Sequence, residues 1–335
     1  TDVNDYYFKA DIFGGEIQLQ NNFKISGNNH LLTYGVDYSN TDTSRLRSKD
    51  RYKITKMNGI QTAAGDDDST SKDTPDSQIT RFGIYLQDEF SSGKIDFIAG
   101  LRFDNYELDA KADSIYLDSG NQKLTRNAAD VPLTDAFAVD LSESSWSPKF
   151  AATYKFNNKV SAYGSYSRGF RAPAYYEVNS SFYNYTDYYI TESNPNLKPE
   201  TSDSYEVGIR RISDNGEIKI AAFYNKYNDF IEQLKIVSSA AASQQDPTLV
   251  DTYKSVNINS AETQGIEFSS GYYFNEDKSG INISSAITYQ EGNNLTDNIP
   301  LTTINPFEAK IALSYISNNE KWNTKLLNTF VGKPR

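Results

Sequence analysis

The 335-residue chain contains no cysteine, one histidine, one methionine and two tryptophans. Without cysteine it has no disulfide framework, no cysteine-ligated zinc or iron–sulfur site and no cysteine nucleophile. The single histidine, His30, excludes sites that require two imidazoles, such as the metalloprotease pair. No stretch approaches the roughly 20 apolar residues of a membrane-spanning helix. These absences exclude membrane helices, but they do not exclude a membrane-spanning β-barrel.

The chain is acidic and rich in aromatic residues. Its 44 Asp and Glu outnumber its 33 Lys and Arg, which gives a formal net charge of −11 at pH 7. No block of basic residues offsets this charge. The composition therefore argues against nucleic acid as a partner, because nucleic-acid binding requires clustered Lys and Arg to displace counterions from phosphate. The aromatic residues are mainly 25 Tyr and 18 Phe.

Apolar residues alternate with polar or small residues in segments of about ten, which is typical of strands with one apolar face. One such segment contains Ile95, Phe97, Ala99, Leu101 and Phe103. No segment of useful length shows the period of about 3.6 residues that marks an amphipathic helix. The pattern therefore predicts an all-β chain of about twelve strands.

Short connections rich in Gly and Asn alternate with long polar connections. The short ones lie at 26–30, 90–94, 156–159, 213–217, 274–280 and 317–320. The long ones lie at about 43–77, 109–144, 172–200, 233–257 and 291–305. This alternation predicts an antiparallel, up-and-down transmembrane β-barrel, with short periplasmic turns, long extracellular loops and residues 1–335 in a single domain. A soluble β-sandwich or solenoid is the alternative.

The two sides of the predicted strands differ in polarity. Polar residues opposite the apolar stripe are predicted to face a wet or plugged lumen. They are Arg81, Gln87, Glu89, Arg102, Lys149, Lys155, Glu206, Arg210, Lys219, Asn225 and Glu267. Aromatic residues near the strand ends are predicted to form girdles at the two membrane interfaces. They include Tyr34, Tyr38, Phe103, Tyr106, Tyr154, Phe156, Tyr272, Tyr273, Phe274, Trp322 and Phe330.

Two motifs carry a resemblance to a known family. Gly-Phe-Arg-Ala-Pro at 169–173 and the run at 194–208 that begins Asn-Pro-Asn-Leu are similar to the FRAP and NPNL boxes of TonB-dependent outer-membrane receptors, in the haem and haemoglobin branch. Ala-Glu-Thr-Gln-Gly-Ile-Glu at 261–267 also resembles that branch. The boxes specify the superfamily better than the substrate, since siderophore and cobalamin receptors carry related boxes.

The resemblance implies a barrel of about 22 strands closed by an N-terminal plug, of which this chain supplies about twelve strands and no plug. It implies a receptor in the outer membrane of a Gram-negative bacterium, surrounded by lipid and lipopolysaccharide, that is powered by TonB through its N-terminal region. The expected partner is haem or a haem-carrying protein, with haem as transported ligand and not as intrinsic cofactor. A ferric siderophore or another small chelate is the alternative cargo. No enzymatic activity is implied, and a passive porin or an outer-membrane hydrolase fits the long aromatic loops and the boxes less well.

The motif residues are predicted to shape the base of the loop between them without contacting the cargo. The first box contributes Phe170, Arg171, Ala172 and Pro173, and the second contributes Asn194, Pro195, Asn196 and Leu197. Proline fixes the backbone and removes a donor where strand pairing ends. Arg171 and Glu200 are expected to form a charged pair across the base.

The loop at 174–193 contains no histidine, although the best-known haem receptors place an iron-ligating histidine there. It is rich in tyrosine and contains Tyr175, Tyr176, Tyr183, Tyr185, Tyr188 and Tyr189. We predict these as ligand-binding residues, because a tyrosinate ligates ferric haem and an aromatic face stacks on a porphyrin. If one of them ligates iron, the mid-loop Tyr183 or Tyr185 is expected. Packing of the loop on itself and recognition of a protein surface are the alternative roles.

His30 and a run of three aspartates are expected to be solvent-exposed and to have no ligand-binding role. His30 follows the tight turn at 27–29, and we expect it to be solvated at the periplasmic end. Asp66, Asp67 and Asp68 are expected to form a solvated loop tip and not a calcium site, because no spaced set of oxygen ligands surrounds them. No resident metal site is predicted.

Overall fold

Twelve long strands form one antiparallel sheet in a computed structural model that describes residues 2–57, 60–65, 69–120, 138–184, 189–238, 251–301, 304–319 and 321–333. The strands are β1 (Asp2–Ile25), β2 (Asn28–Met57), β5 (Asp76–Ser92), β6 (Ile95–Lys111), β7 (Leu141–Lys155), β8 (Val160–Arg171), β11 (Glu200–Ser213), β12 (Gly216–Ser238), β13 (Asp251–Tyr273), β14 (Gly280–Asn294), β16 (Phe307–Ile316) and β17 (Asn323–Val331). Each pairs antiparallel with the next in this order. The up-and-down topology is therefore as predicted.

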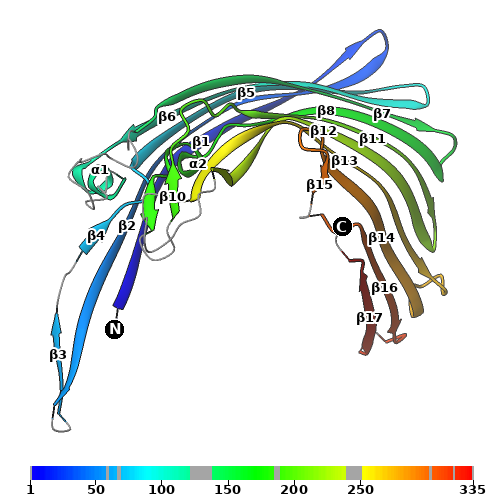
Figure 1. The fold of residues 1–335 in the computed structure, drawn as a ribbon. Coiled ribbons are helices and arrows are strands. Elements are labelled where there is room, and N and C mark those ends of the chain that lie inside the picture. The colour runs from blue at the N-terminus through cyan, green and yellow to red at the C-terminus, as the bar shows by residue number, and fades with distance from the viewer. Residues whose placement is uncertain are drawn as a thin grey trace.

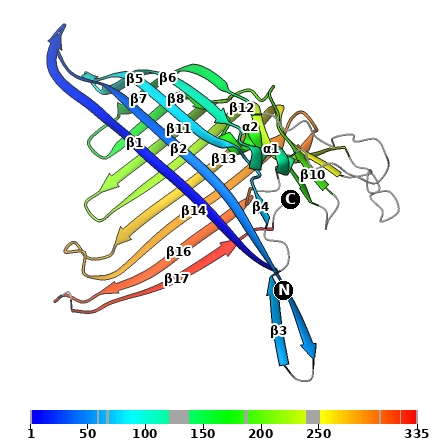
Figure 2. The same cartoon turned by 90° about the vertical axis from the view of Figure 1, so that its left-hand side faces the viewer.

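The sheet curves strongly, and β1 and β17 form its two edges (Figure 1). Within the described residues, no strand pairing joins β17 to β1. Tight turns gather at one end of the strands, whereas α1, α2 and β10 lie at the other (Figure 2). This separation matches the predicted alternation: the short connections lie at one end of the sheet and the long ones at the other.

The loop end of the sheet carries short elements. They are β3 (Ile60–Gly65), β4 (Ser69–Ser71), α1 (Ser114–Gly120), α2 (Tyr175–Asn179), β9 (Phe182–Asn184), β10 (Tyr189–Glu192) and β15 (Ile299–Pro300). The all-β prediction is confirmed for the sheet, and α1 and α2 are short helices that it did not include. These helices have 7 and 5 residues, too few for a helical period to stand out. Among the described residues, no helix is long and apolar enough to cross a membrane.

Strand register gives the sheet one apolar and one polar face. Ile17 of β1 pairs with Val36 of β2, which pairs with Ile84 of β5, and all three side chains are exposed. An exposed apolar face of this extent is unfavourable against water and favourable against lipid. The register places every residue that was predicted to face the lumen on the opposite face.

Side chains on the polar face join strands that are not hydrogen-bonded to each other. Arg102 of β6 donates through Nη1 and Nη2 to the two carboxylate oxygens of Asp37 in β2, at 2.8 and 3.0 Å, across the intervening β5. The Tyr85 hydroxyl of β5 donates to Glu16 of β1 at 2.6 Å, across β2. A bidentate arginine–carboxylate pair is among the stronger polar contacts available to a protein.

The Arg102–Asp37 bridge depends on a glycine beneath it, and this gives a first prediction. A Cβ atom at Gly83 would overlap both the guanidinium of Arg102 and a carboxylate oxygen of Asp37. We expect Gly83→Ala to break the bridge and to lower the free energy of unfolding by roughly 1–3 kcal/mol, measured by urea titration of the receptor in detergent micelles. Gly271→Ala is the matched control, because a Cβ there meets no atom within 4 Å. Equal stabilities of the two variants would contradict the role of the bridge.

His30 lies beside a tight turn, as predicted, but the prediction that it is solvated is wrong. The residue is 8% exposed, because its ring is stacked between Phe23 and Phe90 at centroid distances of 5.2 and 4.6 Å. Its Nδ1 lies 2.8 Å from a carboxylate oxygen of Asp88. Phe97 extends the row at 5.0 Å from Phe90. The imidazole is therefore part of an aromatic row at the turn end of the apolar face.

Candidate ligand-binding site at the loop end

A charged cluster holds the base of segment 172–200. Arg171, the last residue of β8, donates through Nε and Nη2 to Glu200, the first residue of β11, at 2.6 and 3.1 Å. The predicted pair is therefore confirmed. Arg171 Nη1 also donates to both carboxylate oxygens of Glu177 in α2, at 3.0 and 2.8 Å. Glu177 is 2% exposed and accepts further hydrogen bonds from the Ala174 N–H at 2.8 Å and the Gln233 amide at 2.9 Å.

A small apolar core packs beside this cluster. It consists of Ile79, Tyr106, Leu108, Val178, Leu197 and Ile231. The Tyr106 hydroxyl donates to the Pro173 carbonyl at 3.0 Å, which ties the first box to the wall of the sheet. Burial of Leu197, at 2% exposure, ties the second box to the same core.

Of the remaining box residues, Asn194 binds backbone groups, and the others are exposed or half-buried. The Asn194 amide donates to the Ser255 carbonyl at 2.8 Å, and its side-chain oxygen accepts the Asn196 N–H at 3.0 Å. Pro195 and Asn196 are exposed, whereas Phe170 and Ala172 are half-buried. The two boxes thus meet in space and close the loop base.

Helix α1 supports the far side of the segment. The Tyr116 hydroxyl donates to the Asn179 carbonyl at 3.0 Å. The Lys72 ammonium donates to Asp113 at 2.6 Å and to Asp76 at 2.8 Å. Burial raises the pKa of the Asp113 carboxyl, but the hydrogen bonds from Lys72 and the Tyr116 N–H, with the Lys72 charge, together outweigh burial and hold that pKa below its usual range. The ion pair therefore stays charged at neutral pH.

The segment also adds strands of its own. β9 and β10 form an antiparallel hairpin, in which Tyr183 pairs with Ile190. β10 also pairs in parallel with β13, with Tyr189 opposite Asp251. The Tyr189 ring meets that of Tyr253 edge-on, with centroids 5.4 Å apart. The hairpin is thus docked onto a long strand of the sheet.

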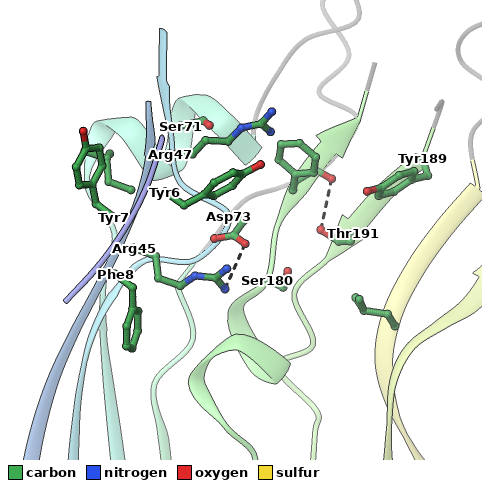
Figure 3. A pocket seen from close by; sticks show the side chains of 13 residues that line it. Tyr6, Tyr7, Phe8, Arg45, Arg47, Ser71, Asp73, Ser180, Tyr189 and Thr191 are labelled. Atoms are coloured by element: carbon green, nitrogen blue, oxygen red, sulfur yellow. Dashed lines mark hydrogen bonds and ion pairs between the residues drawn. The ribbon is translucent and has the colours of Figure 1, made fainter. Parts of the chain in front are cut away.

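A pocket lies between this hairpin and the outer ends of β1 and β2. This rim pocket encloses about 360 Å³, and its lining includes Tyr6, Phe8, Arg45, Arg47, Tyr189 and Leu234. Figure 3 shows the side chains of β1 and β2 on one side of it and Ser180, Tyr189 and Thr191 on the other. The Thr191 hydroxyl donates to the Phe182 carbonyl at 3.4 Å, which supports the far wall.

The rim pocket is cationic and aromatic on its β1–β2 side. Register places Arg45 opposite Phe8 and Arg47 opposite Tyr6. The Arg47 guanidinium lies over the Tyr6 ring, 5.5 Å from its centre. Arg45 makes an ion pair with Asp73 at 3.4 Å, and both side chains are 40% exposed, so the pair is weak and leaves Arg45 N–H groups for a ligand. Two guanidinium groups beside aromatic faces suit a flat ligand with carboxylates.

The tyrosines predicted to bind the ligand lie in different surroundings, and not all of them reach the rim pocket. Tyr189 lines the rim pocket, Tyr176 is exposed, and Tyr175 packs against the apolar core. Burial raises the pKa of the Tyr175 hydroxyl, so it remains a neutral phenol and is a poor iron ligand at neutral pH. Tyr183 lies in β9, whereas Tyr185 and Tyr188 lie outside the described residues.

Sequence reasoning missed the residues on the β1–β2 side of the pocket. Arg45 and Arg47 fall in a stretch predicted as loop, but β2 continues through it to Met57. The signal was the continued alternation of Arg45 and Arg47 with Leu46, which extends the polar face of the strand.

The described residues were predicted to hold no resident metal ion, and their acidic side chains and His30 bear on this point. No group of three or more His, Asp or Glu side chains is arranged there to hold an ion. Asp66, Asp67 and Asp68 lie outside the described residues, so their interpretation as a loop tip stays a prediction.

Comparisons with known proteins agree on a family. The model for "TonB dependent receptor-like, beta-barrel" matches residues 1–334. The chain is 31% identical over 188 residues to the probable hemoglobin and hemoglobin-haptoglobin-binding protein 4 of Haemophilus influenzae, covering 54% of this chain and 18% of that protein. It is 25% identical over 340 residues to the hemin receptor of Yersinia pestis, covering 95% of this chain and 41% of that protein. The chain thus spans less than half the length of these relatives.

Solved structures show the same fold. The hemophore receptor HasR of Serratia marcescens, in complex with its hemophore HasA and heme, matches with a TM-score of 0.68 at 15% identity, over 97% of this chain and 52% of that chain. The copper transporter OprC matches with a TM-score of 0.67 at 17% identity, over 98% of this chain and 45% of that chain.

Proposed function

The chain belongs to the TonB-dependent receptor-like β-barrel family, and from this premise we propose that the receptor containing it imports haem, or haem from a haem-carrying protein. The family is one of receptors in the outer membrane of Gram-negative bacteria. The loop end of the sheet then faces outward and captures the cargo. TonB would supply energy through the plug, and the apolar face of the sheet would contact lipid and lipopolysaccharide.

The rim pocket is the observation that carries the proposal. Haem is a flat macrocycle with two carboxylates, and the pocket offers the guanidinium groups of Arg45 and Arg47 with the rings of Tyr6 and Tyr189. Arginine binds carboxylates through paired N–H groups, and aromatic faces stack on a macrocycle. Relatives that are named as hemoglobin-binding protein and hemin receptor support the same cargo.

The iron ligand is part of the proposal. Tyr183 and Tyr185 remain our candidates, because Tyr183 lies in β9 of the hairpin that borders the rim pocket and Tyr185 follows it closely in the sequence. A tyrosinate is an established ligand of ferric haem in proteins. Contact of the exposed Tyr176 with a haem-carrying protein is the complementary role for this loop.

A ferric siderophore is the second candidate cargo. The cationic lining of the rim pocket favours it as well, because an anionic chelate would also pair with Arg45 and Arg47. The two candidates differ in iron ligation, since a siderophore already supplies its own ligands to the metal.

Hemin titration of the full receptor tests the proposal. We expect a saturable Soret band that is lost when 174–193 is deleted, while the barrel still assembles. Tyr183→Phe or Tyr185→Phe should shift the band if that residue ligates iron. A porphyrin spectrum unchanged by either substitution would remove the ligand assignment.

Growth assays separate the two cargoes. Cells that rely on this receptor should grow with hemin or haemoglobin as sole iron source and should stop growing when 174–193 is deleted. If the deletion abolishes only siderophore-dependent growth, the siderophore replaces haem as the cargo.

A further inference from the structure

A second pocket lies in the wall of the sheet, next to the loop base. This wall pocket encloses about 430 Å³, and its lining includes Arg81 of β5, Arg102 and Asn105 of β6, Ser147 of β7, and Phe170 and Arg171 of β8. Three guanidinium groups in one cavity make it strongly cationic unless carboxylates neutralise them.

Two of the three arginines are neutralised by the protein itself. Arg102 pairs with Asp37 at 2.8 Å and with Asp104 at 2.7 Å. Arg171 pairs with Glu177 at 2.8 Å and with Glu200 at 2.6 Å. Each of these guanidinium groups therefore has two carboxylate partners.

Arg81 differs from both. It is exposed, and among the residues that the structure describes no carboxylate forms an ion pair or hydrogen bond with it. Its guanidinium lies over the Tyr106 ring, 5.4 Å from the ring centre. The Tyr106 hydroxyl is in turn bound to the Pro173 carbonyl. Stacking on an anchored ring orients the guanidinium and leaves its N–H groups available to an anion.

The wall pocket is deeper in the sheet than the rim pocket. Arg81 pairs with Ser39 of β2, whereas Arg45 lies six positions nearer the loop end of the same strand. Six residues of extended strand span about 20 Å. Both pockets share one chemistry, an arginine held over a tyrosine ring, at two levels of the same wall.

We propose that Arg81 binds a carboxylate of the cargo on its way from the rim pocket into the lumen. Ser147 lies on the same face as Arg81 and adds a neutral hydrogen-bonding group to the pocket. The inference rests on the proposed function in taking the cargo as a carboxylate-bearing chelate, and it adds a second binding position that acts after capture.

The test separates capture from import in cells that express the full receptor. Arg81→Gln should leave binding of hemin to chilled cells within about twofold of wild type and lower the rate of hemin uptake roughly tenfold. Arg81→Lys should restore part of the uptake. Lys149→Gln is the matched control, because Lys149 is an exposed cation on the same face outside the wall pocket, and it should import at the wild-type rate.

Hemin dimethyl ester, in which both carboxylates are masked, identifies the group that Arg81 recognises. Its uptake should be equal in wild type and Arg81→Gln. Equal losses for hemin and the diester would assign Arg81 to a contact within the receptor and overturn the proposal. Wild-type hemin uptake by Arg81→Gln, or an equal loss of uptake in Lys149→Gln, would also overturn it.

If wild-type cells import no hemin, the proposed function fails. Uptake of ferric citrate, a carboxylate-bearing chelate, is then measured for the same variants. Loss of its uptake only in Arg81→Gln then supports the wall pocket, and any other result overturns it.

Discussion

Replacing Arg45 and Arg47 together by Gln is expected to weaken hemin binding by the full receptor about a hundredfold or more. Each arginine is placed to make charge-assisted hydrogen bonds with a carboxylate, and such bonds contribute about 1.5–3 kcal/mol each. Glutamine keeps some hydrogen bonding but loses the charge and the paired N–H geometry. The measurement is the dissociation constant from a Soret titration at fixed ionic strength.

Two controls make this result specific to the rim pocket. Lys198→Gln removes an exposed cation at the loop base outside the pocket, and it should bind hemin as wild type does. Hemin dimethyl ester should bind the double variant and the wild type with similar affinity. A double variant that retains wild-type affinity for hemin would show that the carboxylates are bound elsewhere.

Arg171→Leu should disorganise the loop base and abolish cargo binding without preventing barrel assembly. The substitution strips Glu177, which is 2% exposed, of its only cationic partner among the described residues. Removing one partner of a buried ion pair costs about 3–5 kcal/mol. We expect rapid cleavage between 172 and 200 by added protease, together with loss of the hemin Soret band.

The same cluster provides the control and a rescue. Arg168→Leu changes an exposed arginine of the same strand and should leave both the cleavage pattern and the Soret band unchanged. Adding Glu177→Gln to Arg171→Leu removes the unpaired charge and should recover part of the protease resistance. Wild-type protease resistance in Arg171→Leu would refute the role of the cluster.

Local periodicity made most of the fold predictable. The strand that contains Ile95 and Phe103 was recognisable because side chains alternate between the two faces of a sheet, and one face here is apolar. Helix α2 was not recognisable, because five residues held by Arg171 and Gln233 need no helical pattern of their own. Tertiary contacts outweigh local propensity in such short elements.

The candidate site was predictable only in part. Tyr189 could be selected because it lies between two motifs, but Arg45 and Tyr6 come from the other end of the chain. They face Tyr189 only because the sheet curves and brings the β9–β10 hairpin opposite β1 and β2. The sequence also could not show that Arg81 lacks a carboxylate partner among the described residues. That depends on the folded sheet, in which Asp37 pairs with Arg102 and not with Arg81.

The side-chain bridges across β5 and β2 have a mechanical consequence. Arg102 and Tyr85 each link strands two apart in the sheet, so a change of curvature there must disrupt side-chain links as well as backbone geometry. These links oppose a change in the curvature of the sheet. If the receptor imports haem as proposed, we expect the motion that admits the cargo to occur in the loops and not in the sheet.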